Sequence, residues 1–385
     1  MNFNNKMKGL SAIGISDILG TGATAFFWFF LASLISPEQY GQIFYYLGIA
    51  TIASSFVLLG TQNTITVYLA KKIKLQSTLY LVSLLAAFFA SIIIMIWFYR
   101  LDVGFVLIGY VINTLAIGGL LGKKLFKSYS KFVIIQKILV VILGLGFFYI
   151  FGTDGILFAI ALSYIAYTII IFKGMRADTV NFSLLKKNIG FVTNNYSTSI
   201  VQILRTQIDK IIIPTILSFT ILGNFALALQ VMAILNFLPN TVYKFILPYD
   251  ANGNPNSKIK IITIIASVGF AISGLILSPI VIPNLFPEYI QAIEAIQIMS
   301  IATIPGSITM ILTSKFLGLK KSRYVLISRI ISLSLISSCM IILGTFFEII
   351  GLAFAYLIAN SASALFLLIS NYLIVENKNK SKFNN

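Results

Sequence analysis

Four charged side chains lie inside stretches of sequence that are otherwise apolar enough to cross a membrane. Arg205, Asp209 and Lys210 occur within six residues of one another, and Asp17 lies in the first apolar stretch of the chain. A charge at the centre of a membrane helix costs about 2.5–3.5 kcal/mol on insertion scales, so such residues usually face a cavity or a charged partner. We therefore take these four as candidate binding residues.

The spacing around Arg205 predicts a polar face on one helix. Thr198, Gln202, Arg205 and Asp209 follow at steps of four, three and four, which brings their side chains to one side of an α-helix. At this spacing Arg205 and Asp209 can form an ion pair. One interpretation is a buried pair that fixes the rotation of the helix. The other, which we favour, is a cationic binding site, because one carboxylate cannot neutralise both Arg205 and Lys210.

Asp17 belongs to a similar stripe on the first apolar run. It is followed by Thr21, Thr24 and Trp28 at helical spacing. The carboxylate could be a partner for the excess cation, a ligand for a coupling ion such as sodium or a proton, or a residue near the cytoplasmic end of its helix. The sequence leaves these three roles open.

The composition determines what kind of chain must position these residues. Of the 385 residues, 58% are hydrophobic and 10% are charged, whereas a soluble domain has about 45–50% apolar and about 25% charged residues. This composition excludes an ordinary soluble enzyme. At about 20 residues per membrane crossing, the apolar runs predict twelve spans, at 10–35, 42–69, 75–99, 103–122, 132–151, 154–172, 188–217, 222–248, 261–285, 292–317, 324–347 and 349–373.

We therefore expect an all-α polytopic membrane protein with about twelve transmembrane helices in two six-helix lobes around a central cavity. The first lobe would comprise 1–175, a basic cytoplasmic connector 176–187, and the second lobe with a short cytoplasmic tail 188–385. Two motifs recur between the halves at an offset of 196 residues. They are Leu-Gly before a lysine-rich turn at 121 and 317, and Phe-x3-Gly at 151 and 347. An even number of spans in each half predicts parallel repeats.

The basic residues predict the orientation of the chain. The net charge is +17, and the lysines and arginines lie in short clusters between apolar runs, which indicates membrane orientation rather than nucleic-acid binding. With both termini in the cytoplasm, 25 basic residues fall on that side, and the opposite side has only Arg100. The sequence thus predicts a protein of the cytoplasmic membrane whose basic clusters contact anionic lipids.

The residues of several enzyme classes are missing from the sequence. The chain has no histidine, which is the usual general base and the commonest zinc ligand, and no Gly-Lys-Ser/Thr loop for nucleotide phosphates. Its single cysteine, Cys339, cannot form an intrachain disulfide. We expect no catalytic residue, no metal site and no cofactor.

Four segments resemble a known group, the polysaccharide (Wzx-type) flippases of the multidrug/oligosaccharidyl-lipid/polysaccharide exporter superfamily. The segments are the loop 34–41 (LISPEQYG), the stretch 207–210 (QIDK), the loop 285–289 (LFPEY) and the turn 318–321 (GLKK). The resemblance covers most of the chain, from about residue 10 to 370. This resemblance implies two six-helix lobes that flip a polyprenyl-diphosphate-linked oligosaccharide by alternating access. We expect the protein to be a monomer.

The binding residues expected for this substrate are Arg205, Asp209, Lys210, Gln202 and Asp17. An exporter of small molecules that is coupled to a cation is the main alternative. A membrane-embedded polysaccharide polymerase or acyltransferase is a third, although the sequence offers only scattered single carboxylates on the outside.

The basic-residue pattern predicts that the loops at Arg100 and Glu348 face the outside. Single cysteines placed in these loops, in a chain without Cys339, should react in intact cells with a thiol reagent that does not cross the membrane. Protection of either loop would mean that a span has been miscounted.

Overall fold

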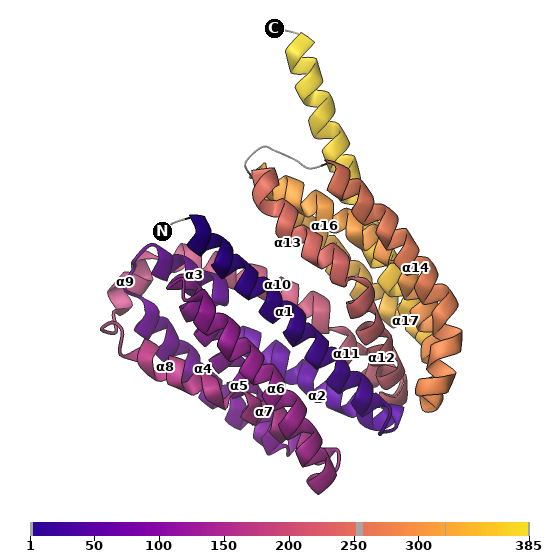
Figure 1. Cartoon of the computed structure of the whole chain (residues 1–385), viewed down its shortest axis with the longest axis horizontal. Helices are drawn as coiled ribbons and strands as arrows, with labels where there is room; N and C mark the ends of the chain where they lie inside the picture. Colours follow the sequence, from indigo (N-terminus) through magenta and orange to yellow (C-terminus); the bar gives the residue numbers. More distant parts are fainter. Residues whose placement is uncertain (1–2, 252–256, 320, 384–385) are drawn as a thin grey trace. The chain divides into compact units, whose positions relative to one another are not determined.

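The computed structural model describes residues 3–251, 257–319 and 321–383, and in this part of the chain every regular element is helical (Figure 1). The first half contains α1 (Phe3–Ala32), α2 (Pro37–Val57), α3 (Gln62–Ala70), α4 (Gln76–Phe98), α5 (Leu101–Gly122), α6 (Phe126–Phe151), α7 (Asp154–Ser163), a 3-10 turn (Ile165–Tyr167) and α8 (Thr168–Met175). The connector forms α9 (Phe182–Lys187). The second half contains α10 (Ile189–Gln207), α11 (Asp209–Ile216), α12 (Phe219–Leu235), α13 (Phe237–Ala251), α14 (Ser257–Leu285), α15 (Ala292–Ile301), α16 (Thr303–Gly318) and α17 (Ser322–Phe383).

The lengths of these helices fit membrane spans. Among the described residues, six helices are long and apolar enough to cross a membrane alone, and three bent pairs, α2–α3, α12–α13 and α15–α16, raise the number to nine. The longest, α17, consists of two helices joined at a kink at Glu348, whose φ of 47° is not helical. The apolar part of α1 is shorter, and the pair α10–α11 is more polar. Each of the twelve predicted ranges thus coincides with a helix or helix pair, and the expected fold class is confirmed.

Prolines lie next to two of the bends. The bend between α12 and α13 measures 49° and is followed by Pro239, and the bend between α15 and α16 measures 41° and is followed by Pro305. Proline is tolerated in the first turn of a helix, where its missing N–H would have no partner, but it ends the helix before it. Pro239 and Pro305 therefore explain why the helix is interrupted at these two points of the chain.

The helices divide into two compact units. The first unit comprises residues 1–31 and 43–207, and the second comprises 32–42 and 208–385. This division by packing differs from the predicted division by chain order, because α10 belongs to the first unit. The ring centre of Tyr68 in α3 lies 5.3 Å from that of Phe191, and its hydroxyl donates a hydrogen bond of 3.1 Å to the carbonyl of Asn188. Tyr196 donates a hydrogen bond of 2.7 Å to the carbonyl of Phe56.

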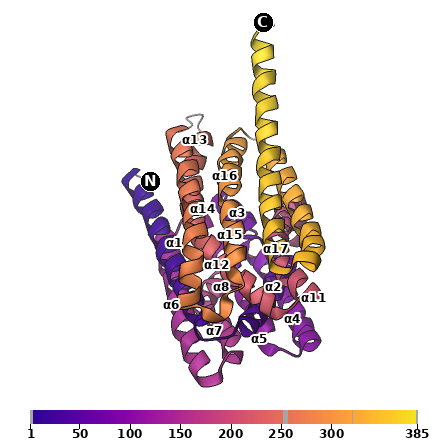
Figure 2. The same ribbon diagram turned by 90° about the vertical axis from the view of Figure 1, so that its right-hand side faces the viewer.

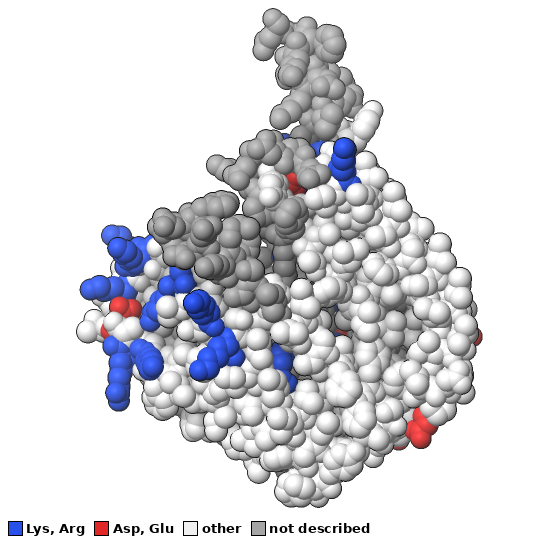
Figure 3. Space-filling view, viewed as in Figure 1, with Lys and Arg blue, Asp and Glu red and all other residues white. Residues whose placement is uncertain are grey.

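Within each unit the helices pack side by side. Figure 2 shows α14, α15, α16 and α17 of the second unit next to one another. In Figure 3, uncharged side chains cover most of the visible face. Basic side chains gather over the part of the first unit that contains α3, α8 and α9, where the exposed ones are Lys71, Lys72, Lys74, Lys173, Arg176, Lys186 and Lys187.

The sequence repeat recurs in the backbone. Gly152 has a φ of 67° and Glu348, which is 196 residues later, has a φ of 47°; each lies in the turn of a helical hairpin. Next to them, Gly155 packs against the carbonyl of Phe147, and Gly351 packs against that of Leu343. These pairs keep the same offset of 196 residues. Both hairpins therefore turn with a similar backbone conformation, which has a positive φ followed by a closely packed glycine.

A second pair of glycines makes a reciprocal contact inside the second unit. Gly41, near the start of α2, lies against the carbonyl of Phe219, and Gly223, near the start of α12, lies against that of Pro37. Serine caps begin both helices: the side chain of Ser36 accepts a hydrogen bond from the backbone of Gln39, and that of Ser218 from Ile221. A side chain at either glycine would push the two helices apart.

Gly223→Ala should therefore destabilise the protein, because its added methyl group would meet the carbonyl of Pro37. Overpacking of this kind costs about 1–3 kcal/mol. Gly146→Ala in α6 is the matched control, since no atom lies within 4 Å of a methyl group there. Thermal unfolding in detergent, followed by intrinsic fluorescence, should show a lower Tm for Gly223→Ala alone. Equal Tm values for both variants would contradict the close contact.

Candidate functional site

The helix α10 carries the expected polar face. Val192 is the only buried side chain of this fully described helix, and Thr198, Gln202 and Arg205 are all half-buried. A helix with so many polar residues and so little buried surface does not fit into hydrocarbon, where each polar group lacks a partner. This face of α10 therefore requires a polar or water-filled space beside it.

Asp209 and Lys210 form a buried ion pair at the start of α11. The Lys210 ammonium lies 3.1 Å and 3.3 Å from the two carboxylate oxygens of Asp209, and the side chains are only 9% and 7% exposed. The carboxylate also lies in the first turn of α11, where the helix dipole favours a negative charge. Asp209 and Lys210, both predicted binding residues, thus form an ion pair inside the second unit. The expected pairing of Asp209 with Arg205 remains a prediction.

The chain changes helix between Gln202 and Lys210. The helix α10 ends at Gln207, Ile208 forms a turn, and α11 begins at Asp209. Pro214 inside α11 removes the backbone hydrogen bond that would reach the carbonyl of Lys210. The charged residues thus lie at an interrupted helix, where small rotations of the backbone cost less than in a continuous one.

Asp17 lies in a separate polar cluster of the first unit. Its half-buried carboxylate accepts a hydrogen bond of 3.0 Å from the hydroxyl of Tyr129 in α6. Lys137, two turns further along α6, interacts electrostatically with the same carboxylate. The Lys137 side chain also packs at Gly20, where a methyl group would lie 3.2 Å from its Cγ. Asp17 therefore has a hydrogen-bond donor and a cation as its neighbours.

The sequence analysis missed two features of these clusters. It counted Lys137 among the basic residues of the cytoplasmic side, but Lys137 lies in the twelfth position of α6, half-buried beside Asp17. It also gave no role to Asp250, whose carboxylate receives 2.6 Å hydrogen bonds from both Lys260 and Ser314 in the second unit. The sequence does contain a signal for Asp250, because it is an acidic residue among the lysines of the side that we predict to be cytoplasmic.

The charged residues of these clusters are suited to binding ions. In the described part of the chain, no three acidic, cysteine or histidine side chains come close enough to hold a metal ion. What the chain offers at membrane depth is arginine and lysine, which bind anions, and single carboxylates, which bind cations or protons.

Solved structures with the same architecture are transporters. A multidrug resistance MATE family transporter of the MOP superfamily, in an inward-facing conformation, matches with a TM-score of 0.73 and 14% identity over 94% of this chain and 96% of the other. The lipid II flippase MurJ, in an inward closed conformation, matches with a TM-score of 0.68 and 16% identity over 95% and 87%. The chain has the fold of the MOP-superfamily transporters.

A third structure points to variation within this fold. A MOP-superfamily transporter from Pyrococcus furiosus matches with a TM-score of 0.61 and 14% identity over 96% of both chains, and is described as having a binding pocket of reverse polarity that suggests a different function. No family model and no curated protein matches the chain. The comparisons thus establish the fold, and the residues of the site must indicate the substrate.

The buried pair predicts a specific pattern of stability. Lys210→Met should lower the free energy of unfolding by about 3–5 kcal/mol, because it leaves the buried carboxylate of Asp209 without its cation. The double variant Asp209→Asn with Lys210→Met removes both charges and should recover most of this loss. Denaturant unfolding in detergent measures both values. A single variant as stable as the parent protein would mean that the pair does not stabilise the fold.

Proposed function

We propose that the chain is a flippase that moves a polyprenyl-diphosphate-linked oligosaccharide across the cytoplasmic membrane by alternating access. The transporter fold supports translocation over catalysis. The observation that carries the choice of substrate is the charge at α10 and α11: Arg205, Asp209 and Lys210 leave one net positive charge within six residues. An anionic group at membrane depth would compensate this charge.

Diphosphate fits these residues chemically. The guanidinium of Arg205 offers a planar set of donors that matches two phosphate oxygens, and hydrogen bonds of this type are stronger than neutral ones. Lys210 is held by Asp209 at 3.1 Å. An arriving diphosphate would compete with that carboxylate for the ammonium group, so binding and a rearrangement of the pair would be coupled. Gln202, one turn before Arg205, would add an amide donor on the same face of α10.

The polyprenyl tail does not need to enter a polar site. It can remain in the surrounding lipid while the headgroup passes, because hydrocarbon is its preferred solvent. Under this proposal both termini face the cytoplasm, the protein acts as a monomer, and the basic clusters at the cytoplasmic side contact anionic lipids.

A second candidate function is export of small molecules coupled to a cation. The observation that favours it is Asp17, a half-buried carboxylate on α1 with a hydroxyl donor from Tyr129 and the cation of Lys137 beside it. A carboxylate in such a setting can exchange a bound proton or sodium ion. A coupling-ion ligand is also one of the three roles open to Asp17 in a flippase, so this carboxylate alone does not separate the two functions, which differ in the cargo.

Arg205→Ala decides whether the arginine binds the cargo. Under the flippase proposal, this variant should reach the membrane in normal amounts but translocate a fluorescent polyprenyl-diphosphate oligosaccharide in proteoliposomes at least about tenfold more slowly, since a hydrogen bond to a charged group contributes roughly 1.5–3 kcal/mol. Arg205→Lys keeps the charge but loses the planar set of donors, and should retain part of the rate. Arg176→Ala, an exposed arginine of the connector, is the matched control.

Two outcomes would oppose the proposal. Normal translocation by the double variant Arg205→Ala with Asp209→Ala would mean that the charges only fix the helix. Efflux of a cationic dye by the parent protein, with no movement of the lipid-linked sugar and with loss of efflux in Asp17→Asn, would support the exporter instead.

A further inference from the structure

The first unit contains an apolar pocket that the proposed transport does not use. Its volume is about 300 Å³, and it lies between α5, α6, α7 and the 3-10 turn that follows α7. Large rings surround it, among them Phe105, Phe147 and Phe158, and the small side chain of Ala161 also lines it. An engineered apolar cavity of about 150 Å³ remains dry and binds benzene. A pocket of twice that volume is therefore suited to hydrocarbon rather than water.

The pocket opens toward the lipid-facing surface of the unit. Three of its lining residues are well exposed, with fractions of 47% for Phe105, 41% for Leu162 and 59% for Ile165. The floor consists of buried residues, including Tyr164, whose ring covers Gly109. Because α5 and the α7–α8 segment are long and apolar enough to span a membrane, we expect the hydrocarbon of the bilayer at the mouth of the pocket.

The pocket lies at the depth of a lipid chain. With a rise of 1.5 Å per residue, Phe105 is about 7 Å and Ile112 about 18 Å along α5 from Arg100 at its end. Half of the hydrocarbon core is about 15 Å thick. The pocket thus extends from the leaflet that contains Arg100 to the middle of the membrane.

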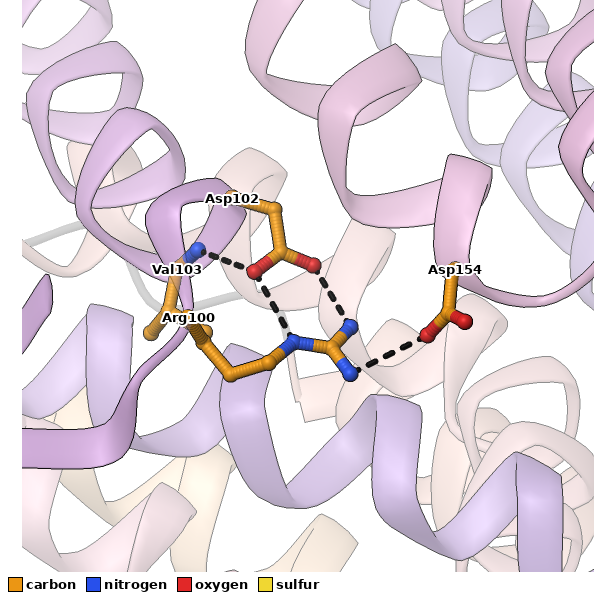
Figure 4. A network of polar contacts seen from close by, with 4 residues as sticks. All are labelled: Arg100, Asp102, Val103 and Asp154. Atoms are coloured by element: carbon orange, nitrogen blue, oxygen red, sulfur yellow. Dashed lines mark hydrogen bonds and ion pairs between the residues drawn. The ribbon is translucent and has the colours of Figure 1, made fainter.

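A charged cluster lies at the end of the same helices (Figure 4). Arg100 donates hydrogen bonds of 3.1 Å and 2.7 Å to the two oxygens of Asp102, and one of 3.0 Å to Asp154 at the start of α7. Its guanidinium carbon also lies 5.0 Å from the centre of the Tyr46 ring. We call Arg100, Asp102 and Asp154 the polar cap. Asp154, Phe158, Leu162 and Ile165 follow at steps of four, four and three, so the cap and the pocket mouth share one face of the helix.

The polar cap keeps bonding capacity for a ligand. Three of the five N–H groups of Arg100 are used in the described structure, and two remain. Asp102 is 2% exposed and is occupied by Arg100 and the backbone N–H of Val103, whereas Asp154 is 79% exposed and has one oxygen free. The hydrogen bonds that Arg100 donates to Asp102 raise the pKa of its guanidinium, which therefore stays charged. The cap presents two cationic N–H donors beside a free carboxylate oxygen.

We propose that the first unit binds an aminophospholipid, with one acyl chain in the apolar pocket and the phosphoethanolamine headgroup on the polar cap. The phosphate accepts hydrogen bonds from Arg100, and the ammonium group donates to the free oxygen of Asp154. The ligand is zwitterionic, and the cap matches it with a cation next to an anion. A headgroup with only negative charge would meet the net charge of −1 that the two carboxylates leave on the cap. A choline headgroup has no N–H to donate.

The proposal can be tested with the full chain in nanodiscs of phosphatidylethanolamine and phosphatidylglycerol. The probe is phosphatidylethanolamine with a diazirine in one acyl chain, and cross-links are mapped by mass spectrometry. We expect cross-links concentrated at residues 105–112 and 158–165, and unlabelled phosphatidylethanolamine should compete better than phosphatidylglycerol. Ala161→Phe fills the pocket and should remove most of this labelling, whereas Ala86→Phe on α4, a half-buried alanine outside the pocket, should not.

Asp154→Asn tests the headgroup separately. The side chain is exposed, so the fold should be unaffected, and the preference for phosphatidylethanolamine over phosphatidylglycerol should fall by roughly two- to fivefold.

Labelling spread evenly over all lipid-facing helices would overturn the proposal. Equal competition by both phospholipids, or stronger competition by undecaprenyl phosphate, would also overturn it, the latter because the pocket would then hold a prenyl chain. If Ala161→Phe does not fold, Asp154→Asn and the competition between phospholipids still test whether the pocket and the polar cap bind phosphatidylethanolamine.

Discussion

Hydrocarbon offers no hydrogen-bond partner to a peptide group, and the rest of this structure depends on that constraint. Every span must therefore satisfy its backbone by itself, which only a helix can do in an open arrangement. The chain interrupts its helices at a few points, such as the bends at Asn236 and Ala302, and at the turns of Gly152 and Glu348. At the turns after α6 and in α17, a glycine lets backbones approach closely, so that the interruption is covered by protein.

The same constraint governs the charges at depth. Asp209, Asp250 and Asp17 each have a lysine or a tyrosine of the same compact unit as a partner, and Asp250 also accepts a hydrogen bond from Ser314. Burying a charge without a partner would cost more than these pairs do. With these carboxylates paired, the net charge of the residues around α10 and α11 is positive. This net positive charge of Arg205, Asp209 and Lys210 is the basis of the proposal that the cargo has an anionic headgroup.

The two proposed ligands make different demands on the fold. The transported lipid-linked sugar needs a polar path, which the exposed polar residues of α10 supply, and it must be released at the end of each cycle. The proposed phospholipid at the apolar pocket needs no movement: its chain fills the gap beside Ala161, and its headgroup joins the ends of α5 and α7. One is cargo, and the other completes the packing of a unit that faces lipid.

The sequence by itself determined the spans, because the length of an apolar run and the positions of lysine and arginine depend on the bilayer and not on which helices are neighbours. It also identified the polar face of α10 and the repeat at 196 residues, since both are local patterns. Only the tertiary structure decided which charges meet. Lys137 interacts with Asp17, and Lys260 with Asp250, because the helices that carry them pack against each other. The apolar pocket belongs to this second group as well, because a gap between helices depends on the shapes of all the side chains around it.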